Sequence, residues 1–132
     1  MQTSDSPGAL VQTFIDLLVA NKPDEACAMV SGDCEYDNVP MGKVFGPDGI
    51  KGSLAPFLDG CSGIIWDVHR QVESGTVQFG TVFNERTDRF QMGGRWIEIP
   101  VCGIFEVRNG KITLWRDYFD QPTFRDQLGG GA

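Results

Sequence analysis

Polar and aromatic residues alternate in the segment Asn84-Glu85-Arg86-Thr87-Asp88-Arg89-Phe90. The segment lies in a run rich in Val, Thr and Phe, which predicts a β-strand. Residues two apart on a strand point to the same face, so Arg86, Asp88 and Phe90 are expected to share one face. One side of this strand would then present a guanidinium, a carboxylate and an aromatic ring together.

A second segment with a related pattern, Trp115-Arg116-Asp117-Tyr118-Phe119, lies in the last predicted strand. If its Asp117 face meets the Asp88 face over one cavity, two carboxylates and one guanidinium gather among aromatic side chains. A planar guanidinium hydrogen-bonds two carboxylates at once. Such a set suits a general acid and a general base held apart by a fixed cation. The alternative interpretation is a structural ion-pair network on a sheet face.

Length and composition restrict the class of protein. The chain has 132 residues, which predicts a single domain over residues 1–132, with residues 1–5 and 129–132 frayed. Hydrophobic residues make up 41% and charged residues 22%, as in soluble globular proteins. The net charge of -7 argues against nucleic acid and anionic membrane as partners. The N-terminus lacks a signal-peptide pattern and no apolar run would span a bilayer, so we expect a cytoplasmic protein.

The cysteine and histidine content disfavours a zinc site. The four cysteines, Cys27, Cys34, Cys61 and Cys102, form no C-x-x-C pair, and His69 is the single histidine. Structural disulfides are not expected in a cytoplasmic protein, so the cysteines are predicted to be free thiols. We expect a structural or exposed position for the histidine.

The order of the predicted elements indicates the fold class. Helices are expected over residues 7–21, 23–30 and 46–58, and strands over 34–39, 64–73, 76–91, 95–108 and 111–120, with a last helical turn over 122–128. This order predicts an α+β fold with the N-terminal helices packed on a strongly curved sheet, mixed but mostly antiparallel. Glycines at 63, 75, 80, 93, 94 and 103 permit strong curvature. The sheet would form a cone with an interior apolar pocket.

The turns predict which residues face the pocket. A tight turn at Gly93-Gly94 pairs residue 88 with 99 and residue 86 with 101, which places Ile99 and Val101 on the proposed site face. If Asn109-Gly110 formed a two-residue turn followed by a regular ladder, Asp117 would pair with residue 102. Residue 102 points away from the proposed site face, so Asp117 would as well. A one-residue offset is therefore required. We predict a three-residue connection with a bulge, which sets Asp117 opposite Val101; a bulge near residue 103 is the alternative.

Three segments carry a resemblance to a known family: Tyr36-Asp37-Asn38-Val39-Pro40, the segment 84–90, and Trp115-Arg116-Asp117-Tyr118-Phe119-Asp120. In this order and spacing they resemble the limonene epoxide hydrolase family, whose cone-shaped fold is shared with ketosteroid isomerases and nuclear transport factor. The resemblance extends from the first predicted helix to residue 120. It implies an enzyme that adds water to a hydrophobic cyclic or alkyl epoxide, in one step without a covalent intermediate, and releases a vicinal diol.

The resemblance also implies roles for individual residues. By position, Asp88 matches the general acid, Asp117 the general base, Arg86 the cation that bridges them, and Tyr36 and Asn38 the residues that position the water. The residues expected to line the substrate pocket are Phe90, Ile99, Val101, Phe119, Leu54 and Leu58. This chemistry needs no metal and no organic cofactor. The family often forms dimers, so a homodimer is expected.

Other functions on the same fold remain open. An isomerase, a dehydratase or a polyketide cyclase is the first alternative, and a non-catalytic small-molecule-binding domain is the second. Dehydratases like scytalone dehydratase rely on paired histidines, and this chain has one histidine. Ketosteroid isomerases use a carboxylic acid and a tyrosine, with no arginine between two carboxylates. The pattern of charged residues therefore favours epoxide hydrolysis.

Overall fold

The computed structural model describes residues 6–128, so the two predicted frayed ends, 1–5 and 129–132, lie outside the described residues. The helices are α1 (Pro7–Val19), α2 (Pro23–Cys27), α3 (Gly46–Asp59) and α4 (Gln121–Leu128). The strands are β1 (Val30–Asn38), β2 (Gly42–Phe45), β3 (Gly63–Thr76), β4 (Phe79–Met92), β5 (Arg95–Arg108) and β6 (Lys111–Tyr118). Within the described chain, no helix is both long and apolar enough to cross a membrane.

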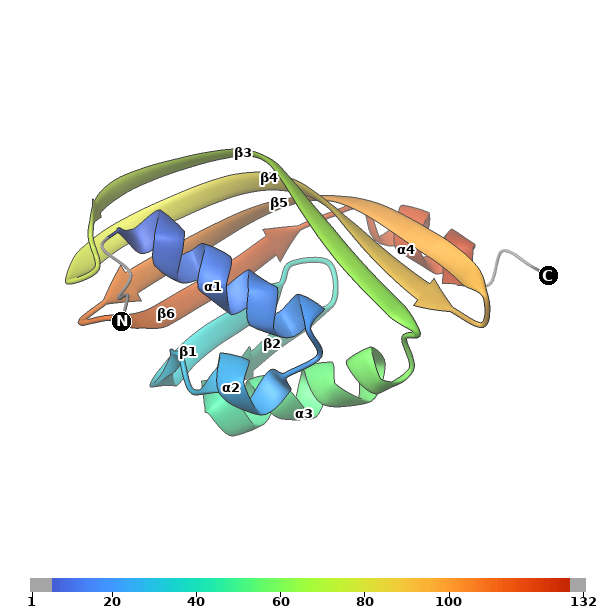
Figure 1. Cartoon of the computed structure of the whole chain (residues 1–132), viewed down its shortest axis with the longest axis horizontal. Helices are drawn as coiled ribbons and strands as arrows, with labels where there is room; N and C mark the ends of the chain where they lie inside the picture. The colour runs from blue at the N-terminus through green and yellow to red at the C-terminus, as the bar shows by residue number, and fades with distance from the viewer. Residues whose placement is uncertain (1–5, 129–132) are drawn as a thin grey trace.

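The strands form one mixed sheet in the order β2-β1-β6-β5-β4-β3. β1 and β6 pair in parallel, and the other neighbouring strands pair antiparallel. The long strands β3, β4 and β5 arch over α1, and α3 lies below the same concave side (Figure 1). α4 lies at the far end of the sheet, near the turn between β4 and β5 (Figure 1). The predicted fold class, helices on a curved and mostly antiparallel sheet, is confirmed.

α1 starts where the sequence predicts and closes the main core. The Ser6 hydroxyl accepts a hydrogen bond from the Ala9 amide at 3.1 Å, and Pro7 occupies the first helical position. Leu10, Val11, Phe14, Ile15 and Leu18 recur at helical spacing and are all buried in the main apolar cluster. Burial of each such side chain contributes roughly 1.5–3 kcal/mol, so this apolar face fixes α1 on the concave side of the sheet.

α3 forms although it contains two helix-weakening residues. Gly52 and Pro56 both lie on its exposed side. Ile50, Leu54 and Leu58 repeat every four residues and are buried. Burial of this apolar face outweighs the poor intrinsic propensity, and it brings one side of α3 over the concave sheet.

The structure differs from the predicted elements near β1. Val30 was expected at the end of the second helix, but it begins β1 and pairs with Ile112. The prediction was wrong because Val30 is 4% exposed in the main core, and packing against β6 outweighs local helical spacing. β2 was not predicted. Its four residues carry little apolar pattern, and the strand exists by pairing with β1.

The turn between β3 and β4 also lies elsewhere than predicted. Residues 77 and 78 form the turn, two positions beyond the expected Gly75. Gly75 has a left-handed φ of 86°, but it remains inside β3 and pairs with Gly80. Within β3 the ladder shifts by one residue between Val68 and Arg70, a bulge that adds to the bend of the sheet.

The register between β4 and β5 agrees with the prediction. Gly93 and Gly94 are both left-handed, with φ of 60° and 79°, and they form the expected tight turn. Asp88 pairs with Ile99, and residue 86 pairs with residue 101. Both pairs face the concave side of the sheet. The turn at Gly93-Gly94 therefore fixes the part of the proposed site that lies on β4 and β5.

The register between β5 and β6 contains the required one-residue offset, but the predicted device was wrong. Asn109 and Gly110 are both left-handed, with φ of 53° and 76°, and Arg108 pairs with Lys111 across a two-residue turn. Asn-Gly supplies both left-handed positions of such a turn, so no extra turn residue is needed. The ladder then shifts between Ile112 and residue 114 of β6, which leaves one extra residue on that strand.

This bulge sets the position of the second carboxylate. Beyond it, Asp117 lies opposite Gly103 rather than opposite the predicted Val101. Val101 and Gly103 have the same parity on β5, so Asp117 still faces the concave side. Asp117 and Asp88 therefore face the same side of the sheet as expected, with Asp117 two residues further along β5 than predicted.

Candidate active site

Arg86 lies at the centre of a buried polar cluster. Its side chain is 0% exposed. Nε donates to Asp88 Oδ1 at 2.9 Å and Nη2 donates to Asp88 Oδ2 at 3.0 Å, a two-point contact between planar groups. Nη2 also donates to Asp117 Oδ2 at 3.0 Å. A single guanidinium thus holds two carboxylates that come from β4 and β6, as the sequence pattern predicts.

Asp117 is fixed by a second donor that the sequence analysis did not identify. The Trp115 indole Nε1 donates to Asp117 Oδ1 at 3.0 Å. Trp115 itself is fully buried, and its ring stacks on the Tyr36 ring with 3.9 Å between centroids and 16° between planes. Both oxygens of Asp117 therefore accept a hydrogen bond. The indole was missed because its burial hides a donor inside an apolar cluster.

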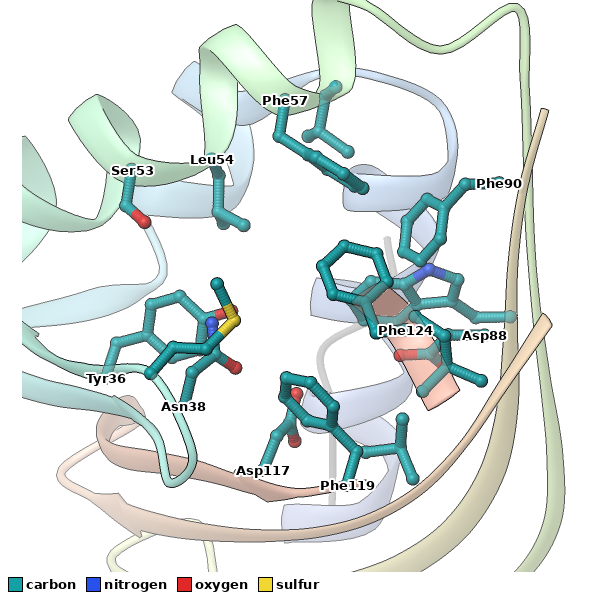
Figure 2. Close-up of a pocket in the computed structure, with 15 residues that line it drawn as sticks. Tyr36, Asn38, Ser53, Leu54, Phe57, Asp88, Phe90, Asp117, Phe119 and Phe124 are labelled. Carbon is teal, nitrogen blue, oxygen red and sulfur yellow. The ribbon is translucent and has the colours of Figure 1, made fainter. Parts of the chain in front are cut away.

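Tyr36 and Asn38 reach the same place through the parallel pairing of β1 with β6. Tyr36 is paired with Trp115, and Asn38 is paired with Asp117. Figure 2 shows Tyr36 and Asn38 on one side of the cavity and Asp88 on the other, with Asp117 below the open space. The structure thus brings four of the five polar residues expected at the site, Tyr36, Asn38, Asp88 and Asp117, to the wall of one cavity. The fifth, Arg86, lies behind this wall and contacts both carboxylates.

The cavity measures about 160 Å³ and its wall is mostly apolar. Its lining includes all six residues expected at a substrate pocket: Leu54, Leu58, Phe90, Ile99, Val101 and Phe119. It also includes five that the sequence analysis missed: Met41, Ser53, Phe57, Trp66 and Phe124. Ser53, Leu54 and Phe57 descend from α3 into the upper part of the cavity in Figure 2.

Some of the missed residues carried a signal in the sequence. Phe57 follows Leu54 by three residues and Ser53 by four on α3, and both spacings place side chains on neighbouring positions of one helix face. Trp66 is the cross-strand partner of Asp88, and its ring lies 4.8 Å from the Arg86 guanidinium carbon. Phe124 lies on α4, and nothing in its local pattern predicts that this helix reaches the cavity.

Burial controls the protonation of the cluster. Burial raises the pKa of Asp88 to about 6; the Arg86 charge and hydrogen bonds oppose this shift, and the Asp117 charge adds to it. Burial alone would lower the pKa of Arg86, but the Asp117 and Asp88 carboxylates outweigh it, so its pKa is raised. Burial also raises the pKa of Tyr36. The guanidinium therefore stays charged and the phenol stays neutral, able to donate its proton in a hydrogen bond.

Side chains of the opposite parity lie on the outer face of the sheet. Arg116 donates to Asp37 at 3.1 Å and to Glu35 at 2.8 Å, so Asp37 is buried in an ion pair on this face. His69 is exposed and contacts the Thr87 hydroxyl. All four cysteines are free thiols, as predicted. Among residues 6–128, His, Cys, Asp and Glu side chains form no group that could hold a metal ion.

Helices on a curved mixed sheet, with a buried arginine between two carboxylates at an apolar cavity, define a cone-fold protein equipped for acid–base chemistry. The family model of the limonene-1,2-epoxide hydrolase catalytic domain matches residues 5–128, and the chain belongs to this family. Epoxide hydrolase EphG of Mycobacterium tuberculosis is 34% identical over 110 residues, which cover 83% of this chain and 70% of that protein.

Solved structures agree with the fold. The structure of an M. tuberculosis LEH-like epoxide hydrolase superposes with a TM-score of 0.76 and 32% identity, over 92% of this chain and 88% of that one. A protein with a ketosteroid isomerase-like fold from Catenulispora acidiphila DSM 44928 gives a TM-score of 0.77 at 17% identity, over 94% of each chain, which shows the fold alone. The family and its relatives support epoxide hydrolase activity at the level of the family.

Proposed function

We propose that this protein hydrolyses small hydrophobic epoxides to vicinal diols by direct addition of water. The observation that carries the proposal is the arrangement of Asp88 and Asp117 around one buried guanidinium, at the wall of an apolar cavity. One carboxyl must give a proton and the other must take one. The environment raises the pKa of Asp88, which assigns it the acid role and leaves the base role to Asp117.

The reaction balances with the groups that line the cavity. Tyr36, Asn38 and Asp117 hold a water molecule near one ring carbon, and Asp117 takes a proton from it as the new C–O bond forms. The bond from that carbon to the ring oxygen breaks at the same time. Asp88 transfers its proton to the leaving oxygen, which becomes the second hydroxyl of the diol. Exchange with solvent then returns a proton to Asp88 and removes one from Asp117.

The size of the cavity limits the substrate. A cavity of about 150 Å³ in another protein holds a benzene molecule, so about 160 Å³ suits an epoxide fused to one six-membered ring or a short alkyl epoxide. Aromatic side chains from α3, β4 and α4 surround this space and provide few hydrogen-bonding groups. We therefore propose an apolar cyclic or alkyl epoxide as the substrate class.

A product assay tests the proposed function. The protein is incubated with a panel of epoxides that includes cyclohexene oxide and limonene oxide, and diols are quantified by chiral gas chromatography. We expect diol from cyclohexene oxide above the rate in buffer. The absence of diol from every epoxide in the panel would contradict hydrolysis and favour a small-molecule-binding domain.

The pH dependence of the reaction follows from Asp88. Its carboxyl holds a proton below about pH 6 and loses it above, so kcat/KM for a neutral epoxide is expected to fall as the pH rises past about 6. The same shift acts on stability with a defined sign. The pKa of Asp88 in the folded protein lies above its unfolded value of roughly 3.9, so protonation of Asp88 favours the folded state. Its contribution to the free energy of unfolding is present at low pH and is lost as the pH rises from about 4 to 6.

Two measurements check this pH prediction. A kcat/KM profile for cyclohexene oxide should decline on its alkaline side, and a profile that stays level between about pH 5 and 9 would contradict the acid role. Urea unfolding at several pH values should show a stability loss between about pH 4 and 6 in the natural protein relative to Asp88→Asn.

Assembly, location and domain content are further parts of the proposal. The outer face of the sheet exposes the apolar side chains of Ile65, Val72, Phe83 and Tyr118, which supports a homodimer through this face. Sedimentation analysis would test it, and a monomer at all concentrations would contradict it. We further propose that the chain forms a single domain of this family and works in the cytoplasm, as its sequence predicts.

A further inference from the structure

Arg86 makes a fourth hydrogen bond that the proposed reaction does not use. Its Nη1 donates to Asn84 Oδ1 at 3.0 Å, on the side of the guanidinium away from Asp88. Asn84 is 2% exposed and is not part of the cavity wall. It therefore contacts the cation without contacting the substrate.

The orientation of the Asn84 amide is fixed by a chain of hydrogen bonds. Its Nδ2 donates to Gln71 Oε1 at 3.1 Å, and Gln71 Nε2 donates to the Gly8 carbonyl at 3.4 Å. A flipped Asn84 amide would point an N–H donor at the N–H of Arg86, so the oxygen must face the guanidinium. This chain connects the first turn of α1 through β3 to the buried cation.

We propose that Asn84 is a positioning residue that holds the Arg86 guanidinium in its bridging orientation without adding charge. The inference rests on the proposed function. With the guanidinium charged, one carboxylate ionised and one carboxyl protonated, the buried cluster is neutral. An amide oxygen accepts the Nη1 proton and leaves this balance unchanged. A carboxylate at the same position would add a second anion to a buried site, and the cluster would bind protons more tightly.

Two substitutions separate orientation from charge. Asn84→Leu has a similar volume and no acceptor, so the guanidinium loses its outer contact. We expect kcat to fall by roughly tenfold to a hundredfold with KM within about threefold, because the cavity wall is untouched. Asn84→Asp keeps an acceptor and adds a charge. We expect the kcat/KM profile of this variant to move upward by on the order of one pH unit.

A matched control makes the same chemical change elsewhere. Asn109→Asp alters the exposed turn between β5 and β6, where Asp tolerates the left-handed φ of 53°. It adds the same net charge far from Arg86. We expect its activity and pH profile to coincide with those of the natural protein.

A protein-only measurement keeps the test independent of turnover. In protein labelled with ¹³C at aspartate carboxyl carbons, the carboxyl resonances of the cluster are titrated by NMR. We expect Asn84→Asp to shift the titration of Asp88 upward and Asn109→Asp to leave it unchanged. An inactive natural protein would contradict the proposed function, while this titration would still test the role of Asn84.

Two results would overturn the inference. One is a carboxyl titration in Asn84→Asp that coincides with that of the natural protein. The other is a folded Asn84→Leu protein with natural kcat and an unchanged pH profile. Circular dichroism checks folding, and if Asn84→Leu does not fold, the Asn84→Asp titration alone decides.

Discussion

Asparagine in place of either Asp88 or Asp117 is expected to reduce epoxide hydrolysis by roughly 10²–10⁴-fold, the typical contribution of general acid–base catalysis. An amide at position 88 has no acidic proton to give to the leaving oxygen. An amide at position 117 does not take a proton from water. Each change removes one end of the proton transfer, so both variants are expected to fail on every epoxide that the natural protein hydrolyses.

These two variants should remain folded. The asparagine oxygen still accepts a hydrogen bond from Arg86. Asp117 remains the ionised partner of the guanidinium in Asp88→Asn. In Asp117→Asn the Asp117 charge that raises the pKa of Asp88 is gone, so Asp88 ionises beside Arg86 and no buried charge is left alone. Asp67→Asn is a matched control, because it makes the same change on an exposed residue of β3 that pairs with Arg89. An exposed ion pair contributes about 0–1 kcal/mol. Initial rates measure the activity of each variant, and circular dichroism measures whether it is folded. Turnover at the natural rate in Asp88→Asn or Asp117→Asn would contradict the assigned roles.

Gly103→Ala is expected to disable the site from a residue that takes no part in the reaction. A Cβ at this position would lie 2.6 Å from Arg86 Nη1, 2.8 Å from Asp117 Oδ1 and 3.2 Å from Asn84 Oδ1. The guanidinium is held by four hydrogen bonds and has no room to withdraw. We expect overpacking to cost about 1–3 kcal/mol of stability and to displace Arg86 from its bridging position.

Gly103→Ala is expected to reduce kcat by more than its effect on the free energy of unfolding would explain. A displacement near 1 Å at the reacting groups can reduce the rate by roughly a hundredfold. Gly52→Ala is the control, because a Cβ there meets nothing within 4 Å and an exposed helical glycine gains about 0.5–1 kcal/mol as alanine. Urea unfolding and kcat are measured for both variants. A Gly103→Ala protein with natural kcat would show that the cluster tolerates displacement and would contradict this account.

Local patterns in the sequence predicted one half of the site. Alternation along β4 placed Arg86 and Asp88 on one face, and the Gly93-Gly94 turn fixed the register of β5. Strand alternation and the Gly-Gly turn each depend on residues close together in the sequence, so contacts with distant segments do not change what they predict. The need for Asp117 to face the same cavity also predicted a one-residue offset before β6.

The other half depends on contacts between distant segments. The offset lies within β6, because Asn109 and Gly110 complete a two-residue turn and an extra residue is accommodated only later in the ladder. The register of the three strands places Asn84, Gly103 and Asp117 side by side across β4, β5 and β6, with Gly103 paired to Asn84 on one side and to Asp117 on the other. This placement is what brings Asn84 and Gly103 next to Arg86. No local pattern distinguishes that glycine from the glycines of the turns.

The central claim is that water adds directly to the epoxide, and a single turnover in heavy-oxygen water tests it. The protein in excess is mixed with cyclohexene oxide in H₂¹⁸O, and both the diol and the intact protein are analysed by mass spectrometry. Because Tyr36, Asn38 and Asp117 are proposed to hold the attacking water, we predict one ¹⁸O in the diol and none in the protein. Label in the Asp117 carboxyl, with unlabelled oxygen in the first diol formed, would identify Asp117 as the nucleophile and contradict direct attack by water.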